Sequence, residues 1–212
     1  MKIVCFGDSI TGFRPDVPYL HQYIKWPDIL CSMLSVQLSY PVTVLNRGYA
    51  GDSTEAIGNL PGALNRLESE VIAEQPQVVV ILLGANDAGA AAQSGDSTAE
   101  ARFETNLGFI VSRLLENDIK VLLLQYHQTR SAEAETGWHH GNRFNDAIER
   151  VAKAQGVPVV AMEPDFAHAL ERYRPEELLD PVDGIHLRPA GELVYAEIIF
   201  RALKSKFPAL FS

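Results

Sequence analysis

Five short runs of apolar and mostly β-branched residues, separated by longer segments, constrain the fold of this chain more than any other sequence feature. The runs cover residues 2–6, 42–46, 77–83, 120–125 and 157–161. Continuous apolar runs of this length are typical of strands buried on both faces, and their alternation with helices is the pattern of a parallel sheet. The sequence therefore predicts an α/β fold in which helices cover both faces of a sheet of about five parallel strands.

Several of the segments between these runs carry apolar residues at the three- and four-residue spacing that is typical of helices packed on one side. We expect helices at residues 26–38, 63–74, 99–117, 142–155 and 190–206. Pro27 suits a first helical turn, and Gly156 suits a helix end. The glycine-bracketed segment 88–96 is predicted to be a mobile loop, and segment 127–141 a second long loop.

Length and charge limit the classes of protein to which the chain can belong. With 212 residues, of which 47% are hydrophobic, it can bury one substantial core, so a single domain over residues 1–212 is expected. Its net charge of −9 and its lack of a basic run argue against a nucleic-acid partner. Oligomeric state cannot be predicted from a single sequence.

The apolar stretches are also too short for membrane or export segments. None approaches the roughly 18 to 20 residues that span a bilayer. The start of the chain lacks the apolar core of a signal peptide, so we expect a cytoplasmic protein. In that compartment Cys5 and Cys31 are expected to be reduced thiols rather than a disulfide, and neither has a neighbour at metal-ligand spacing.

The stretches that directly follow the strands are the candidate functional segments, because open parallel sheets bind ligands beyond the carboxyl ends of their strands. Residues 7–9 follow the first run, residues 46–53 the second and residues 84–87 the third. A fourth polar stretch, residues 183–186, lies late in the chain.

Ser9, His186 and Asp183 supply the parts for acyl transfer. The Ser9 hydroxyl is a weak nucleophile at neutral pH until a base removes its proton. His186 is the best candidate for this base, because imidazole titrates near neutrality and can return the proton to a leaving group. Asp183, three residues before His186, can accept the other ring N–H and fix the tautomer. We expect these three side chains to form a catalytic triad.

An oxyanion that develops during acyl transfer needs hydrogen-bond donors that are already in place. Three candidates follow strands: the backbone N–H of Ser9, the backbone N–H of Gly51 and the side-chain amide of Asn86. The sequence therefore predicts an oxyanion hole made of Ser9, Gly51 and Asn86.

Each of these features has an ordinary structural explanation when it is taken alone. A Gly-Asp-Ser sequence after a strand is usually a turn, and Gly51 could serve backbone conformation only. Asn86 could open a loop or cap a helix, and Asp183 with His186 could be a surface pair. Their joint occurrence at strand ends is what favours catalysis.

Taken together, the four stretches resemble the conserved blocks of the SGNH, or GDSL-type, hydrolases, and the resemblance covers residues 7–191. It implies a flavodoxin-like three-layer α/β/α sandwich and serine-ester hydrolysis without a cofactor or a metal. It also implies Ser9 as nucleophile, Asp183 and His186 as the rest of the triad, and Ser9, Gly51 and Asn86 as the oxyanion hole.

Two positions depart from the pattern of that family. Ile10 stands where the motif has leucine, and segment 125–130 replaces a proline-rich turn that often shapes the substrate pocket. The acyl and alcohol parts of the substrate therefore stay open. The small size of the chain favours short acyl groups such as acetyl, with lysophospholipase or acyl thioesterase activity as alternatives.

Three functions of other classes are weaker alternatives. A nucleotide- or sugar-binding α/β protein is possible for such a fold, but no glycine-rich phosphate motif is present. Asp8, Asn86, Asp87 and His186 could belong to a metal-dependent phosphoesterase, which would need more converging ligands. A larger α/β-hydrolase would need a G-x-S-x-G elbow, and Gly12 lies one residue too far from Ser9.

Residues beside the motifs are candidates for the rim of a substrate pocket. After strands or beside motifs these are Tyr49, Asp52, Asp87, Tyr126 and Trp138, and in the segment after the nucleophile Arg14, Tyr19, His21 and Trp26. None is placed in the catalytic set, because tyrosine and tryptophan at such positions are as often packing residues. Asp8 is interpreted as a structural neighbour of Ser9 and not as the triad acid.

Overall fold

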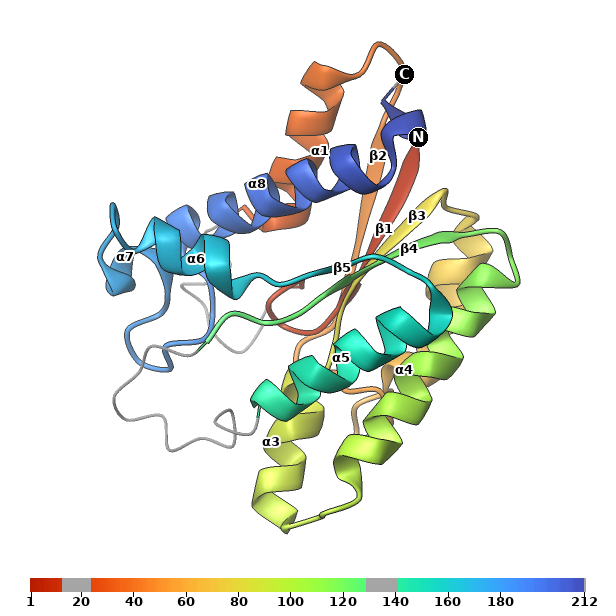
Figure 1. The fold of residues 1–212 in the computed structure, drawn as a ribbon, viewed down its shortest axis with the longest axis vertical. Helices are drawn as coiled ribbons and strands as arrows, with labels where there is room; N and C mark the ends of the chain where they lie inside the picture. The colour runs from red at the N-terminus through yellow and green to blue at the C-terminus, as the bar shows by residue number, and fades with distance from the viewer. Residues whose placement is uncertain (13–23, 129–140, 212) are drawn as a thin grey trace.

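A parallel sheet of five strands runs through the centre of the computed structural model, which describes residues 1–12, 24–128 and 141–211 (Figure 1). The strands are β1 (Lys2–Gly7), β2 (Thr43–Gly48), β3 (Val78–Leu82), β4 (Lys120–Leu124) and β5 (Val159–Val160). Their spatial order is β2-β1-β3-β4-β5, and every neighbouring pair is parallel. The five predicted strands are confirmed, although β5 is reduced to two residues.

Helices cover both faces of this sheet (Figure 1). One layer contains α1 (Trp26–Gln37), α6 (Glu163–Ala169), α7 (Pro175–Leu178) and α8 (Pro189–Lys206). The other contains α2 (Ala63–Arg66), α3 (Ala85–Ser94), α4 (Ala99–Leu115) and α5 (Gly141–Gln155). A π-helical turn (Leu67–Val71) and a 3₁₀ turn (Ile72–Glu74) continue α2, and a last 3₁₀ turn covers Pro208–Leu210. The predicted three-layer α/β/α sandwich is confirmed.

Strand β1 shows why the apolar runs are continuous. Ile3 and Cys5 belong to the core beneath α1 and α8, whereas Val4 and Phe6 belong to the core beneath α4 and α5. Successive side chains of a strand point to opposite faces, so a strand with a core on each side must be apolar at every position.

The prediction of a loop at residues 88–96 is wrong, because residues up to Ser94 continue helix α3. The segment is rich in alanine, which has the highest helix propensity, and this outweighs the single internal Gly89. Gly95 ends the helix in the left-handed conformation, at φ 67°. Of the second predicted loop, only His127, Gln128 and Gly141 are described, and Gly141 already begins α5.

Other expectations concern residues inside and outside the described part. Cys5 and Cys31 are both free thiols. Across residues 1–12, 24–128 and 141–211, no helix has the length and apolar character needed to cross a membrane. Four of the proposed rim residues lie outside the described residues: Arg14, Tyr19, His21 and Trp138.

The strand order positions the carboxyl ends where a site can form. From β1 the chain goes to β2 on one side and later to β3 on the other, and ligand crevices form where the order reverses in this way. Gly7 pairs in register with Gly48 of β2 and with Leu82 of β3. The three segments that follow these strands therefore begin at the same level of the sheet edge.

Candidate active site

Ser9 lies on a tight turn that begins where β1 ends. The carbonyl of Asp8 accepts the backbone N–H groups of Thr11 and Gly12, at 3.1 and 2.8 Å. A Cβ on Gly7 would lie 2.6 Å from the carbonyl oxygen of Leu82, so only glycine allows the turn to pass this close to β3. The strand end thus presents the Ser9 hydroxyl at the carboxyl edge of the sheet.

The structure brings together the three side chains of the predicted triad. Ser9 Oγ lies 2.8 Å from His186 Nε2, and His186 Nδ1 lies 2.7 Å from Asp183 Oδ2. Because a carboxylate only accepts, Nδ1 carries the proton in this hydrogen-bond network. Nε2 is then the acceptor for the Ser9 hydroxyl.

Asp183 is held in place by its own loop. Its Oδ1 accepts the backbone N–H groups of Ile185 and His186, at 2.9 and 3.0 Å. Partial burial works to raise the pKa of Asp183, but the hydrogen bond and charge of His186, together with these backbone donors, outweigh it and lower the pKa to about 2. The carboxylate is therefore ionised throughout the neutral range.

The three predicted oxyanion donors follow three neighbouring strands. Gly51 lies in the turn after β2 with φ at 79°, and Asn86 lies in the first turn of α3, after β3. Asn86 Nδ2 donates one of its two hydrogens to the carbonyl of Asp52, at 2.7 Å. Within the described residues, the backbone N–H groups of Ser9 and Gly51 have no acceptor.

A buried ion pair that sequence reasoning missed supports the loop that carries Gly51. Arg66 Nη2 lies 2.5 Å from Asp52 Oδ2, and both side chains are almost wholly buried. Arg66 also donates to the carbonyl of Arg47, at 3.1 Å, and its guanidinium lies over the ring of Phe6. Burial raises the pKa of Asp52, and Arg66 opposes that shift. Arg66 lies within α2, away from any strand end, so the strand-end rule could not find it.

The pocket-rim hypothesis is wrong for three residues that are buried. Asp52 is 0% exposed and forms an ion pair with Arg66. Trp26, at the start of α1, is 0% exposed, and Tyr126 is 2% exposed. Tyr126 instead donates its hydroxyl proton to Asp8 Oδ2, at 2.6 Å. Tyr49, at 43% exposure, remains a candidate for the rim.

The two carboxylates once considered as metal ligands, Asp8 and Asp87, are engaged by protein donors. Asp8 accepts the N–H of Ile10, at 2.9 Å, and the hydroxyl of Tyr126. Burial raises the pKa of Asp8 to about 6 against these hydrogen bonds. Asp87 accepts the N–H and the hydroxyl of Thr54. Among the residues for which coordinates are described, no three metal-ligating side chains converge.

A second buried ion pair that was not predicted joins α1 to α8. Lys25 Nζ lies 2.5 Å from Glu192 Oε1, and Glu192 Oε2 accepts the backbone N–H of Trp26, at 2.7 Å. Burial raises the pKa of Glu192, while the charge of Lys25 opposes the shift. The pair fixes the start of α1 on the helix that follows the His186 loop.

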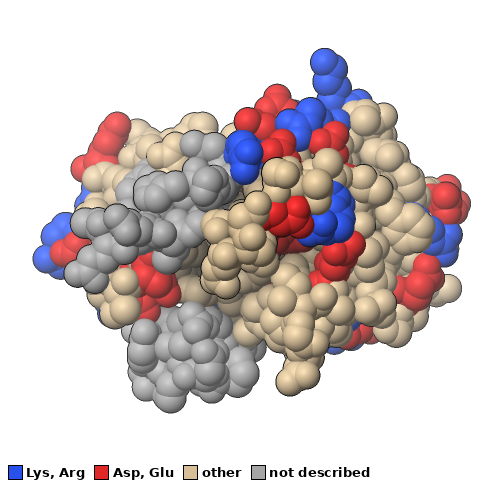
Figure 2. All heavy atoms as spheres, turned by 90° about the horizontal axis from the view of Figure 1, so that it is seen from below, with Lys and Arg blue, Asp and Glu red and all other residues tan. Residues whose placement is uncertain are grey.

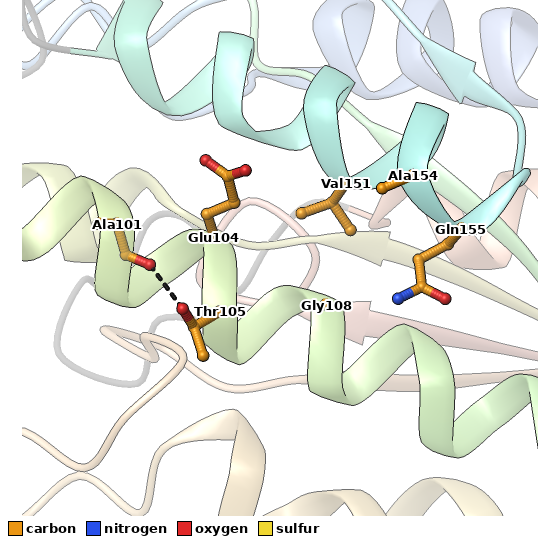
Figure 3. A pocket seen from close by; sticks show the side chains of 7 residues that line it. All are labelled: Ala101, Glu104, Thr105, Gly108, Val151, Ala154 and Gln155. Atoms are coloured by element: carbon orange, nitrogen blue, oxygen red, sulfur yellow. Dashed lines mark hydrogen bonds between the residues drawn. The ribbon is translucent and has the colours of Figure 1, made fainter.

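A surface pocket of about 540 Å³ lies elsewhere, between α4 and α5 (Figure 3). Glu104, Thr105 and Gly108 line it from α4, and Val151 and Gln155 line it from α5. No predicted site residue contributes to it, so it is separate from the Ser9 site. The view from below in Figure 2 shows acidic and basic side chains interspersed, with no continuous basic surface on the described part of that face.

A parallel α/β/α sandwich with a serine, a histidine and an aspartate in hydrogen-bond contact at its carboxyl edge has the architecture of a serine hydrolase. A model of the GDSL-like Lipase/Acylhydrolase family matches residues 5–193, and the chain belongs to this family. It is a carboxylic ester hydrolase, and the family implies a small-molecule ester as substrate.

Individual proteins are similar to the chain over most of their length. The uncharacterized lipoprotein YqeF of Bacillus subtilis is 27% identical over 222 residues, which cover 92% of this chain and 86% of that protein. The crystal structure of a lipase/acylhydrolase from Enterococcus faecalis has a TM-score of 0.72 at 27% identity and covers 96% of this chain and 95% of that one. Axe2, an acetylxylan esterase from Geobacillus stearothermophilus, has a TM-score of 0.74 at 19% identity, covering 94% and 92% of the two chains.

Proposed function

We propose that the chain hydrolyses carboxylic esters of short acyl groups through an acyl-enzyme on Ser9. The observation that carries the proposal is the continuous hydrogen-bonded path from Ser9 through His186 to Asp183, with distances of 2.8 and 2.7 Å. A neutral imidazole that accepts from the serine and donates to an ionised carboxylate is the arrangement that activates a hydroxyl.

In the first half of the reaction Ser9 Oγ attacks the ester carbonyl carbon while its proton passes to His186 Nε2. The carbonyl electrons move onto oxygen, where the N–H groups of Ser9 and Gly51 and the second hydrogen of the Asn86 amide stabilise the oxyanion. Collapse of this intermediate expels the alcohol, which takes the proton from His186. The acyl group is then bound to Ser9.

In the second half a water molecule takes the place of the alcohol. His186 removes a proton from the water as it attacks the acyl carbon, and the oxyanion donors act again. Collapse returns the proton to Ser9 Oγ and releases the carboxylic acid. Asp183 stays ionised throughout and stabilises the imidazolium that forms in each half.

The proposed acyl group is acetyl or of similar size. The similar fold of acetylxylan esterases is compatible with small acyl groups. Lysophospholipids and acyl thioesters are the alternative substrates, and a panel of substrates separates these possibilities.

The test is hydrolysis of 4-nitrophenyl esters of two to twelve acyl carbons, beside acetylated xylose, a lysophospholipid and an acyl thioester. We expect the highest kcat/KM on acetyl or propionyl esters. The Ser9→Ala variant should lose activity by about 10³-fold or more with its fold intact. Ser35→Ala is the matched control, because that hydroxyl donates only to its own helix, at the Cys31 carbonyl.

Two results would contradict the proposal. Full activity in Ser9→Ala would exclude Ser9 as the nucleophile. A preference for long acyl chains or for thioesters would contradict the proposed short-acyl ester substrate. Labelling of Ser9 by a fluorophosphonate, located by mass spectrometry, supports the assignment without depending on the choice of ester.

A further inference from the structure

A part-buried hydrogen-bonded cluster adjoins two of the oxyanion donors in the chain and contains no residue of the triad. It consists of Asp87 in the first turn of α3, Thr54 in the loop after β2 and Asn106 in α4. Thr54 is 1% exposed. We propose that Asp87 and Thr54 form a positioning pair that fixes the loop of Gly51 against the helix turn of Asn86, an inference that rests on the proposed esterase function.

The contacts between the pair are numerous for two short side chains. Thr54 donates its backbone N–H to both carboxylate oxygens of Asp87, at 3.1 and 3.2 Å. It also donates its hydroxyl proton to Asp87 Oδ1, at 2.5 Å. A carboxylate is suited to this arrangement, because it accepts several hydrogen bonds and donates none.

Asn106 determines which way the Thr54 hydroxyl points. Its Nδ2 lies 3.2 Å from Thr54 Oγ1 and can only donate, so Oγ1 is the acceptor in that contact. The single hydroxyl proton is then directed at Asp87. The orientation of Thr54 is thereby fixed from α4 on one side and from α3 on the other.

The pair stands next to the oxyanion donors in the sequence. Thr54 follows Gly51 by three residues, and Asp87 is the neighbour of Asn86. A second connection runs parallel to the first, because Asn86 Nδ2 donates to the Asp52 carbonyl, at 2.7 Å. Two connections between residues 52–54 and the start of α3 define the separation and the orientation of the Gly51 N–H and the Asn86 amide.

The carboxylate of Asp87 has an energetic cost, because its charged form is partly desolvated in the folded chain. Burial, together with the nearby charge of Asp8, raises the pKa of Asp87 to about 6 against the hydrogen bonds from Thr54. An uncharged side chain at this position would avoid the cost of desolvation. In return, this carboxylate accepts three hydrogen bonds from Thr54, which together hold the loop of Gly51 in one orientation.

The experiment compares Thr54→Val, Thr54→Ser and Asp87→Asn by steady-state kinetics on 4-nitrophenyl acetate. Titration with a fluorophosphonate normalises each rate to the competent enzyme. We expect Thr54→Val and Asp87→Asn to lower kcat by about tenfold or more while KM stays within about twofold, because only transition-state contacts are displaced. Thr54→Ser keeps the hydroxyl and should restore kcat to within about twofold of the unmodified chain.

The matched control is Thr105→Val, since that hydroxyl donates only to the Ala101 carbonyl of its own helix, at 2.9 Å (Figure 3). It should leave both kinetic constants unchanged. The inference is overturned if Thr54→Val keeps its kcat per labelled site, or if Thr54→Ser is as slow as Thr54→Val. Should Thr54→Val fail to fold, the isosteric Asp87→Asn is the deciding variant. The inference is then overturned if Asp87→Asn keeps its kcat per labelled site.

Failure of the inference differs from failure of the proposed function. In the first case the unmodified chain hydrolyses the ester, Ser9→Ala abolishes hydrolysis, and the Thr54 and Asp87 variants are unaffected. In the second case the unmodified chain shows no hydrolysis that depends on Ser9.

Discussion

The carboxylate of Asp183 holds the His186 imidazole in one orientation and one tautomer. Its Oδ2 accepts the Nδ1 proton at 2.7 Å, and its Oδ1 accepts two backbone N–H groups of its own loop. Although burial opposes ionisation, these contacts lower the pKa of Asp183 to about 2. Protonation of Asp183 therefore has no part in any loss of activity observed between pH 5 and 8.

Asp183→Asn tests this assignment at the scale of one side chain. An amide can donate as well as accept, so it no longer favours the tautomer whose Nε2 accepts from Ser9. We expect kcat to fall by about 10³-fold or more at neutral pH. Asp165→Asn is the control, because Asp165 is an exposed residue paired with Arg201. A kcat within tenfold of the unmodified chain would contradict the role of Asp183.

Sequence chemistry could predict Ser9 and His186, which lie 177 positions apart in the chain and 2.8 Å apart in the structure. A hydroxyl directly after an apolar run and a histidine in an Asp-x-x-His segment both carry a chemical signal. Arg66 and Thr54 carry none, because an arginine within a helix and a threonine in a loop are ordinary residues. Their importance depends on the carboxylates of Asp52 and Asp87, which only the folded chain places beside them.

At the scale of elements, the end of β4 is connected to the turn that follows β1. Tyr126, two residues after β4, donates its hydroxyl proton to Asp8 Oδ2 at 2.6 Å, and both residues are buried. The hydrogen bond spans 118 positions of the chain. Burial raises the pKa of Asp8 to about 6, and this hydrogen bond limits the rise.

Tyr126→Phe removes the hydroxyl and keeps the ring. The Asp8 carboxylate then loses a donor, so we expect the free energy of unfolding to fall by about 1–3 kcal/mol at pH 8. At pH 5 the loss should be smaller, because a protonated Asp8 depends less on a donor. Urea denaturation at both pH values measures the difference.

Tyr40→Phe is the matched control for that experiment. Its hydroxyl donates to the Leu210 carbonyl near the end of the chain, in contact with no titratable side chain of the site. Its effect on stability should be the same at pH 5 and pH 8. An equal loss at both pH values in Tyr126→Phe would contradict the connection to Asp8.

The elements themselves show where sequence patterns are informative and where they are not. The helices α1, α4, α5 and α8 follow from apolar spacing because each packs one side on the sheet. Helix α3 does not, because its alanine- and glycine-rich sequence lacks large apolar residues, and Ala88 is its buried residue. Alanine favours a helix through its backbone propensity. In this segment the glycines and small polar residues between the alanines are more typical of a loop, so the pattern predicted a loop.

At the scale of the whole molecule, the sheet places the site through its register. Gly7, Gly48 and Leu82 are partners across three strands, so the segments carrying Ser9, Gly51 and Asn86 leave the sheet together. The apolar runs predicted the strands and their parallel arrangement. The side-chain network behind the oxyanion donors could not be predicted, because it joins loops whose paths depend on packing against α2 and α4.

The carboxyls of Asp8 and Asp87 at this edge make the stability of the molecule depend on pH. The pKa values of Asp8 and Asp87 are raised by burial from the usual 3.8 to about 6 in the folded chain. Each group therefore contributes stability that is fully present below about pH 4 and is lost as pH rises through about 6. Asp183 and Asp96, whose pKa values are lowered to about 2, act in the opposite sense, and their contribution is lost as pH falls from about 4 towards 2. Stability should then be greatest near pH 4.

Asp87→Asn isolates one of these contributions. A shift of about two pKa units corresponds to about 3 kcal/mol in all, of which roughly half is lost above pH 5. The stability difference between pH 5 and pH 8 should therefore be smaller in the variant by about 1–1.5 kcal/mol. Asp165→Asn removes the same charge at the surface and controls for the net charge of −9, which favours lower pH in the same direction. Thermal unfolding of the three proteins across this range measures the slopes. If Asp87→Asn and Asp165→Asn keep the same slope, Asp87 does not titrate near pH 6. If only Asp87→Asn becomes flatter, and also loses kcat, then the molecule retains a destabilising carboxylate because its active site requires one.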